Sequence, residues 1–126
     1  MLFRSRQVDR WYPGSRFVLT MRDTASWLAS AEWLFSKGRE KWKWGPWEHC
    51  IHQRLYGFVD SAFNARRARE VYERHNDSVR EYFKNRDADL LIIDWLTTNE
   101  WGALCEFLRK PIPPDPIPHL NKRPPE

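Results

Sequence analysis

The sequence predicts an α/β fold that is rich in helix and contains a short parallel sheet. Two short apolar runs, residues 17–21 and 90–94, have the composition of buried strands. A helical pattern follows each run, and the strongest helical pattern of the chain, residues 62–84, lies between them. Because strands connected through helices pair in parallel, these elements predict a sheet covered by helices. Two strands are few for such a sheet, so we expect sequence that precedes Met1, or a partner, to supply more.

Composition narrows the possible classes of function. The 126 residues suffice for one domain or part of one, and 41% of them are hydrophobic, which is enough for a core. The formal net charge of +4 suits an anionic ligand but is far weaker than the basic stripe of a duplex DNA binder. The sequence shows no secretory signal and no run near the ~20 apolar residues of a membrane span. Nothing argues for pairing of Cys50 with Cys105, so we expect a reducing, cytoplasmic location.

The first third of the chain is expected to contain a strand, a tight turn and a helix. Residues 1–11 show no clear period and are expected to be irregular, and residues 12–15 form a turn. After the strand, Asp23 or Thr24 can cap a helix, because either side chain accepts a bond from a free backbone N–H. The apolar side chains of that helix fall within one arc, and Gly38 is expected to end it.

The remaining elements are predicted from spacing and composition. Residues 41–46 form a basic, tryptophan-rich loop, and a helix is expected from about residue 47 to residue 59. The long helix over residues 62–84 has apolar residues at spacings of three and four. A short helix follows the second strand, with Asn99 as its expected cap. The proline-rich residues 111–126 are expected to form an extended, irregular tail.

Arg22 is the first candidate for a functional residue. In an open parallel sheet, ligands gather beyond the carboxyl ends of the strands, and Arg22 stands at such an end. The next helix begins beside it with unpaired N–H groups and a partial positive charge, which together favour an anion. Ser30, at the margin of the apolar arc of that helix, can complete the site. The alternative is a solvated turn followed by a surface serine.

These residues resemble a family. Residues 17–23, then Trp27 and Ser30, are similar to the segment that follows an internal strand in sulfotransferases that use 3′-phosphoadenosine 5′-phosphosulfate (PAPS). The resemblance implies a three-layer, P-loop NTPase-like sulfotransferase fold in which Arg22 and Ser30 hold the 3′-phosphate of the donor. It continues through residues 72–76, 90–94 and 118–121 and covers about residues 12–122. Basic residues of the family's terminal loop can reach the same phosphate, which implies that role for Lys122 and Arg123.

Two functional features of the family pattern are missing from this sequence. The loop that cradles the phosphosulfate lies near the start of the family's domain, and it has no counterpart here. The acceptor-side catalytic base also belongs to an upstream segment. We therefore expect residues 1–126 to be the C-terminal portion of one sulfotransferase domain, with no catalytic residue and no activity alone. The complete domain would transfer a sulfuryl group from PAPS to a hydroxyl or amine acceptor, without a metal.

Other residues suggest weaker alternatives. His49, Cys50 and His52 could ligate a metal, but Cys50 points away from the shared face of the histidines, so we expect no metal site. His75 is expected to be a satisfied core histidine. The loop over residues 41–46 is expected to pack its tryptophans on the domain, although such a sequence can also stack on nucleotides or gate an acceptor site. Two further functions stay open: an interaction protein that self-associates through an exposed sheet edge, and a weak binder of single-stranded nucleic acid.

Overall fold

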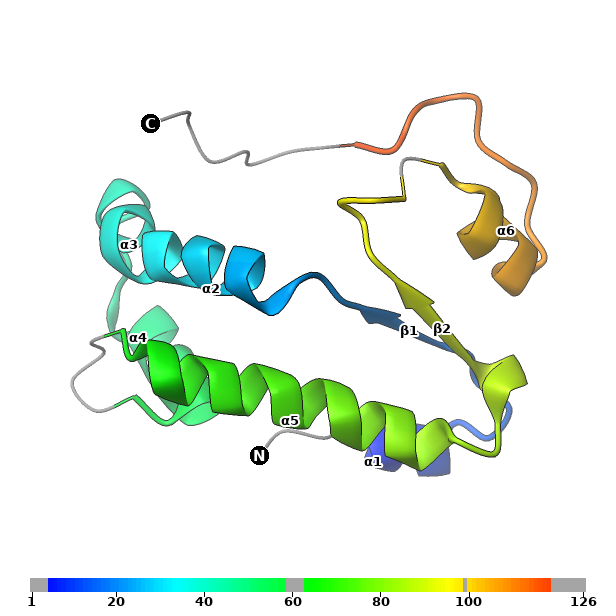
Figure 1. Ribbon diagram of the computed structural model, residues 1–126, viewed down its shortest axis with the longest axis horizontal. Helices are drawn as coiled ribbons and strands as arrows, with labels where there is room; N and C mark the ends of the chain where they lie inside the picture. The colour runs from blue at the N-terminus through cyan, green and yellow to red at the C-terminus, as the bar shows by residue number, and fades with distance from the viewer. Residues whose placement is uncertain (1–4, 59–62, 99, 119–126) are drawn as a thin grey trace.

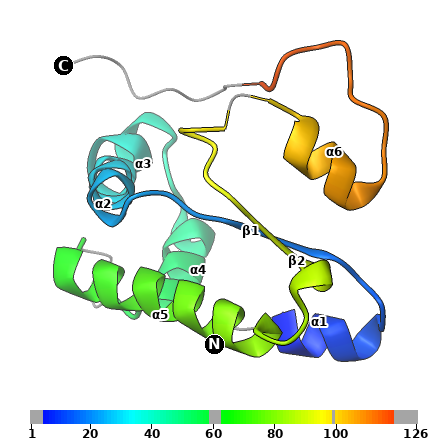
Figure 2. The same cartoon turned by 45° about the vertical axis from the view of Figure 1, so that its right-hand side comes forward.

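The computed structural model describes residues 5–58, 63–98 and 100–118. Helices lie on either side of two central strands: α5 runs along one side and α6 lies on the other (Figures 1 and 2). In chain order the elements are α1 (Ser5–Trp11), β1 (Phe17–Thr20), α2 (Thr24–Trp33), η1 (Leu34–Gly38), α3 (Arg39–Lys41), α4 (Pro46–Tyr56), α5 (Ala65–Phe83), η2 (Asp87–Asp89), β2 (Leu90–Ile93) and α6 (Gly102–Leu108).

The sheet consists of β1 and β2, which pair in parallel with Phe17 opposite Leu90 and Thr20 opposite Ile93. One more bond, from the Met21 N–H to the Ile93 carbonyl at 2.8 Å, extends the ladder past the end of β1. The predicted α/β class and the short parallel sheet are confirmed, and both strands lie within a residue of their predicted bounds. The resemblance to a P-loop NTPase-like fold and the expectation of further strands stay predictions.

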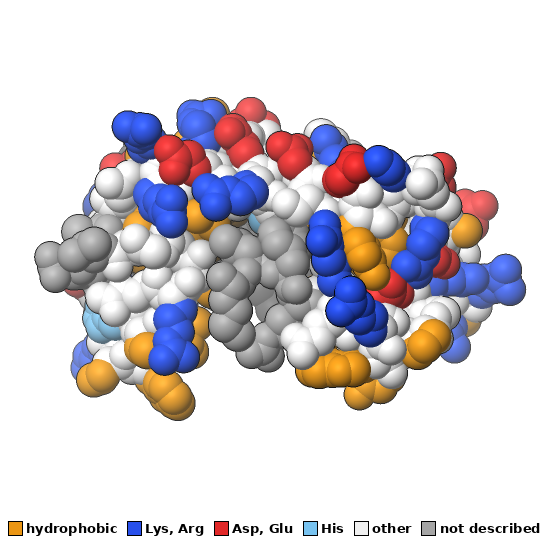
Figure 3. Space-filling view, turned by 90° about the horizontal axis from the view of Figure 1, so that it is seen from below, with side chains coloured by type: hydrophobic (Ala, Val, Ile, Leu, Met, Phe, Trp, Pro, Cys, Tyr) orange, Lys and Arg blue, Asp and Glu red, His pale blue; other side chains and the backbone are white. Residues whose placement is uncertain are grey.

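Helix α5 forms the core of the molecule together with β1. Its buried side chains Val79 and Phe83 pack against Leu19, and the rings of Phe17 and Phe83 lie 4.9 Å apart. The opposite face of α5 is charged, and basic and acidic side chains alternate along one edge of the molecule in Figure 3. The structure therefore confirms the predicted amphipathic helix, which begins three residues later and ends one residue earlier than expected.

The structure corrects the prediction that Gly38 ends the helix after β1. The chain continues from α2 through the π-helical turn η1 into α3, and Gly38 has helical backbone angles. A Cβ atom at this position would lie 3.2 Å from side-chain atoms of both Trp33 and Trp42. The glycine is explained by this close approach of two indole rings, which meet edge to face, and not by the end of a helix.

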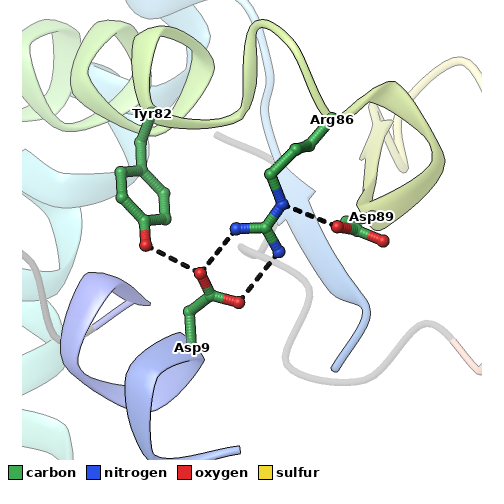
Figure 4. Close-up of polar contacts among 4 residues, drawn as sticks. All are labelled: Asp9, Tyr82, Arg86 and Asp89. Atoms are coloured by element: carbon green, nitrogen blue, oxygen red, sulfur yellow. Dashed lines mark hydrogen bonds and ion pairs between the residues drawn. The ribbon is translucent and has the colours of Figure 1, made fainter. Parts of the chain in front are cut away.

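Residues 1–11 were expected to be irregular, and this expectation is wrong for residues 5–11, which form α1. The helix is held by a charged cluster rather than by an apolar face, so it has no periodic signal. Its Asp9, only 8% exposed, accepts bonds from Arg86 at 2.6 and 2.9 Å and from the Tyr82 hydroxyl at 2.7 Å (Figure 4). Arg86 also donates to Asp89 at 2.7 Å, so one guanidinium joins α1 to the segment before β2.

The observed bounds of the later elements can be compared with the predicted ones. Helix α4 ends at Tyr56, earlier than predicted, because Gly57 adopts the left-handed conformation with φ of 63°. Helix α6 begins after Trp101, and the predicted cap Asn99 lies outside the described residues. Residues 111–118 have no regular structure, as expected for the proline-rich tail. The Trp101 indole N–H donates to the Asp115 carbonyl at 2.7 Å and so fixes part of this tail.

A second core cluster is aromatic and lies between α2, α4 and α5. Phe35, Phe58 and Ala68 are its buried residues. The indole of Trp44 stacks on the imidazole of His52, with ring centroids 4.3 Å apart and planes 10° apart. Burial lowers the pKa of His52, with a further lowering by His49 and an opposing effect of Glu48.

Among the described residues, no helix combines the length and apolarity that a membrane span requires.

Replacing Asp9 with Asn is expected to lower the thermal unfolding midpoint at neutral pH by several degrees, because Arg86 loses its carboxylate partner. The hydrogen bonds from Arg86 and then Tyr82 lower the pKa of Asp9 to about 2. The stability that Asp9 contributes is therefore present above about pH 4 and is lost as the pH falls towards 2. Calorimetry across this range should show a weaker acid dependence in Asp9→Asn. Asp77→Asn, at an exposed site on α5, is the control, and equal behaviour of the two variants would contradict this role.

Replacing Trp44 with Ala is expected to raise the pKa of His52 towards its usual 6.5, because the stacked indole keeps water from the imidazole. NMR titration of the ring protons measures this change directly. Trp47→Ala is the control, since Trp47 is 75% exposed and its loss should leave the His52 pKa unchanged. A wild-type His52 that titrates at or above the usual value would show that the ring is not buried as described.

Candidate functional site

Arg22 lies just beyond the carboxyl end of β1, in the short segment that leads into α2. Its Nη2 donates a hydrogen bond to the Ser26 hydroxyl, in the opening turn of α2. The guanidinium therefore faces the start of the helix, where a partial positive charge adds to its own. This is the strand-to-helix junction at which the sequence analysis expected an anion to bind.

The start of α2 is already partly occupied by the chain itself. Asp23 is the N-cap, and its Oδ2 accepts from the Ser26 N–H at 2.7 Å. The Trp27 N–H bonds the Asp23 carbonyl at 2.9 Å. Of the two predicted cap candidates, Asp23 and not Thr24 fills the position. Because Asp23 occupies a donor that an anion would otherwise use, the guanidinium and the serine hydroxyls are the main groups left for an external anion.

One donor of Arg22 lacks a partner among the described residues. Its Nε is buried and makes no hydrogen bond there. A buried donor without an acceptor costs about 1–3 kcal/mol, and more when the group is charged. Arg22 borders a pocket of about 230 Å³ whose lining also includes Trp27, Tyr72 and Asp94. Because Arg22 lines this pocket and has a donor left without an acceptor, the pocket is the candidate site that we consider for an anion.

Tyr72, from the middle of α5, holds the backbone of Arg22. Its hydroxyl accepts from the Arg22 N–H at 2.9 Å and donates to the Arg22 carbonyl at 2.9 Å. Its ring stacks on the indole of Trp27, with centroids 4.2 Å apart and planes 13° apart. This aromatic pair also lines a second pocket, of about 280 Å³, that extends along α5 to His75 and Asn76. The pair therefore lines both cavities.

Asp94 introduces a negative charge at the same pocket. It follows β2 directly, so it lies at the same carboxyl edge of the sheet as Arg22, and both residues line the pocket. Its Oδ1 accepts from the Leu96 N–H at 2.9 Å, which starts the turn after the strand. The negative charge of this carboxylate repels an anion, so it weakens the binding of an anionic ligand in the pocket.

The structure describes only some of the sequence-predicted phosphate ligands. Ser30 lies one helical turn beyond Ser26 on the same side of α2 and is half-buried, whereas the side-chain bond of Arg22 goes to Ser26. Lys122 and Arg123 lie outside the described residues. Sequence reasoning missed Ser26, although its spacing of four from Arg22 was a usable signal. It also missed Tyr72 as a partner of Arg22, and no local pattern connects residues so distant in sequence.

The other residues considered in the sequence are the possible metal ligands, the two cysteines and the tryptophan-rich segment. Within residues 5–58, 63–98 and 100–118, no three His, Cys, Asp or Glu side chains are grouped closely enough to hold a metal ion. Both cysteines are free thiols. In the tryptophan-rich segment, Trp44 packs into the aromatic cluster as expected, while Trp42 and Trp47 are 44% and 75% exposed. Trp42 also packs on the domain through its edge-to-face contact with Trp33, so the expectation is correct for both tryptophans of residues 41–46.

Comparison with known proteins bears on the whole chain rather than on single residues. No curated protein matches it significantly. Residues 2–124, nearly the full length, match the family model described as a sulfotransferase domain. The match includes the junction of β1 with α2, the long helix α5 and β2. The chain therefore belongs to the sulfotransferase domain family.

Proposed function

We propose that this chain contributes to sulfuryl transfer from PAPS to a hydroxyl or amine acceptor, and that Arg22 binds the 3′-phosphate of the donor. The observation that carries the proposal is that Arg22 lines a pocket while its buried Nε has no acceptor among the described residues. Ser26 and Ser30 are the hydroxyl donors that would share the phosphate. Family membership supports the reaction class, because sulfotransferases generally use PAPS as their donor.

In this proposal the site orients the donor and does not act on the reacting atoms. Sulfuryl transfer breaks the bond between the sulfur and the phosphate oxygen of PAPS and forms a bond from the sulfur to the acceptor. The 3′-phosphate lies at the far side of the ribose from that sulfur. Arg22 therefore lowers the barrier only by holding the donor in place, which is a binding and positioning role.

The expected affinity of these contacts alone is modest. A hydrogen bond to a charged group contributes about 1.5–3 kcal/mol, and a helix start adds about 0.3–1 kcal/mol. A millimolar dissociation constant already requires about 4.1 kcal/mol. Because Asp94 works against the anion, we expect binding in the millimolar range for ligands held only through Arg22 and its neighbours.

The first test compares two nucleotides that differ only in the 3′-phosphate. NMR titration of the full chain should show tighter binding of adenosine 3′,5′-bisphosphate than of adenosine 5′-monophosphate. Arg22→Gln is expected to reduce the affinity for the bisphosphate about tenfold, because it removes a charge-assisted contact, and to leave the monophosphate unaffected. Arg74→Gln, at an exposed position of α5, is the matched control. A wild-type chain without preference for the bisphosphate would refute the proposed function.

The second test concerns the charge of Asp94. Asp94→Asn keeps an oxygen for the Leu96 N–H and removes the negative charge, so the affinity for the bisphosphate is expected to rise about fivefold. The same titration measures it, and the gain should shrink as salt is added. Asp87→Asn, at an exposed site in η2, provides the comparison. An unchanged or weaker affinity in Asp94→Asn would place the phosphate away from this pocket.

A further inference from the structure

We propose that Tyr72 is a positioning residue that sets the direction of the Arg22 guanidinium towards the 3′-phosphate. The inference rests on the proposed function and adds to it a residue from a different part of the chain. Arg22 itself contacts the ligand in that function, whereas Tyr72 acts through the backbone of Arg22. The evidence is the pair of hydrogen bonds that one hydroxyl makes with both backbone groups of a single residue.

These bonds replace the ones that regular structure would provide. Arg22 lies after the last residue of β1 and before the first residue of α2, so its backbone belongs to neither element. The last ladder bond is made by Met21, one residue earlier. The Tyr72 hydroxyl satisfies both the N–H and the carbonyl of Arg22, each at 2.9 Å. The point from which the guanidinium extends is therefore fixed by α5.

The hydroxyl is itself held in place. Tyr72 is 9% exposed, and its ring is parallel to the indole of Trp27, which belongs to α2. A stacked ring between two helices has little freedom to rotate, so the hydroxyl stays directed at Arg22. The Arg22 side chain is then guided at its other end by the bond from Nη2 to Ser26. A long side chain that is fixed at both ends loses less entropy when it binds a phosphate.

A purely structural role of Tyr72 would also explain its bonds to the backbone of Arg22. The test must therefore separate a structural role from a positioning role. A structural tyrosine stabilises the fold but leaves the preference between nucleotides unchanged. A positioning tyrosine affects the 3′-phosphate selectively, because only that group contacts Arg22. The useful readout is therefore the ratio of affinities for adenosine 3′,5′-bisphosphate and adenosine 5′-monophosphate, measured beside the unfolding midpoint.

The experiment compares two Tyr→Phe variants on the same helix. Tyr72→Phe keeps the ring on Trp27 and removes both bonds to Arg22, and we expect the affinity ratio to fall about fivefold. Tyr82→Phe removes a bond to Asp9 at 2.7 Å and should lower the unfolding midpoint without changing the ratio. Tyr72→Phe with an unchanged ratio would overturn the positioning role, while the wild-type preference for the bisphosphate would still support the proposed function. A wild-type chain without that preference overturns both.

A second measurement covers the case in which Tyr72→Phe fails to fold. If the bonds from Tyr72 and the binding of the phosphate support each other, each must strengthen the other by the same factor. Saturation of the wild-type chain with the bisphosphate should then slow hydrogen exchange of the Arg22 amide, which donates to Tyr72. Saturation with the monophosphate should not. Equal exchange of this amide in both complexes would contradict the proposal.

Discussion

The Tyr72 hydroxyl bonds both backbone polar groups of Arg22, and these two bonds fix the point at which β1 passes into α2. The junction would otherwise be a short segment without a ladder or a helix to order it. The guanidinium extends from this point, Arg22 lines the pocket, and the buried Nε of Arg22 has no partner among the described residues. A positive donor that is kept away from water is costly unless an acceptor arrives, and this cost is what makes the junction a candidate anion site.

Helix α5 links this site to the rest of the molecule. Its Val79 and Phe83 form the core with β1, its Tyr72 orders the strand-to-helix junction, and its Tyr82 bonds Asp9 on α1. One helix thus packs the sheet and contacts two polar clusters with two tyrosine hydroxyls. The cluster around Asp9 and Arg86 lies outside the proposed site and orders the start of the chain, whereas the cluster around Arg22 leaves a donor for a ligand.

The parts of the structure that local sequence determines were predictable. Two continuous apolar runs located the strands, and a three-and-four spacing located α5, because both signals come from burial along one element. The prediction that Gly38 ends a helix was wrong because its role depends on Trp33 and Trp42, which meet only in the folded chain. Helix α1 gave no periodic signal because an ion pair with Arg86 holds it.

The residues of the candidate site also differ in whether local sequence could predict them. Arg22 was found from its place after an apolar run and from the family resemblance, which is local information. Ser26 shares its helix and was within reach of that reasoning. The pairing of Tyr72 with Arg22 depends on how α5 packs across α2, and a single sequence contains no signal for such a contact.

The most direct measurement of the central claim is the NMR signal of the Arg22 Nε–H group during addition of adenosine 3′,5′-bisphosphate to the full chain. If the buried Nε is the donor that receives the 3′-phosphate, this signal should shift strongly and exchange more slowly with water, and the monophosphate should leave it unchanged. An Nε–H signal that is indifferent to the bisphosphate, while other residues respond, would show that the phosphate binds elsewhere.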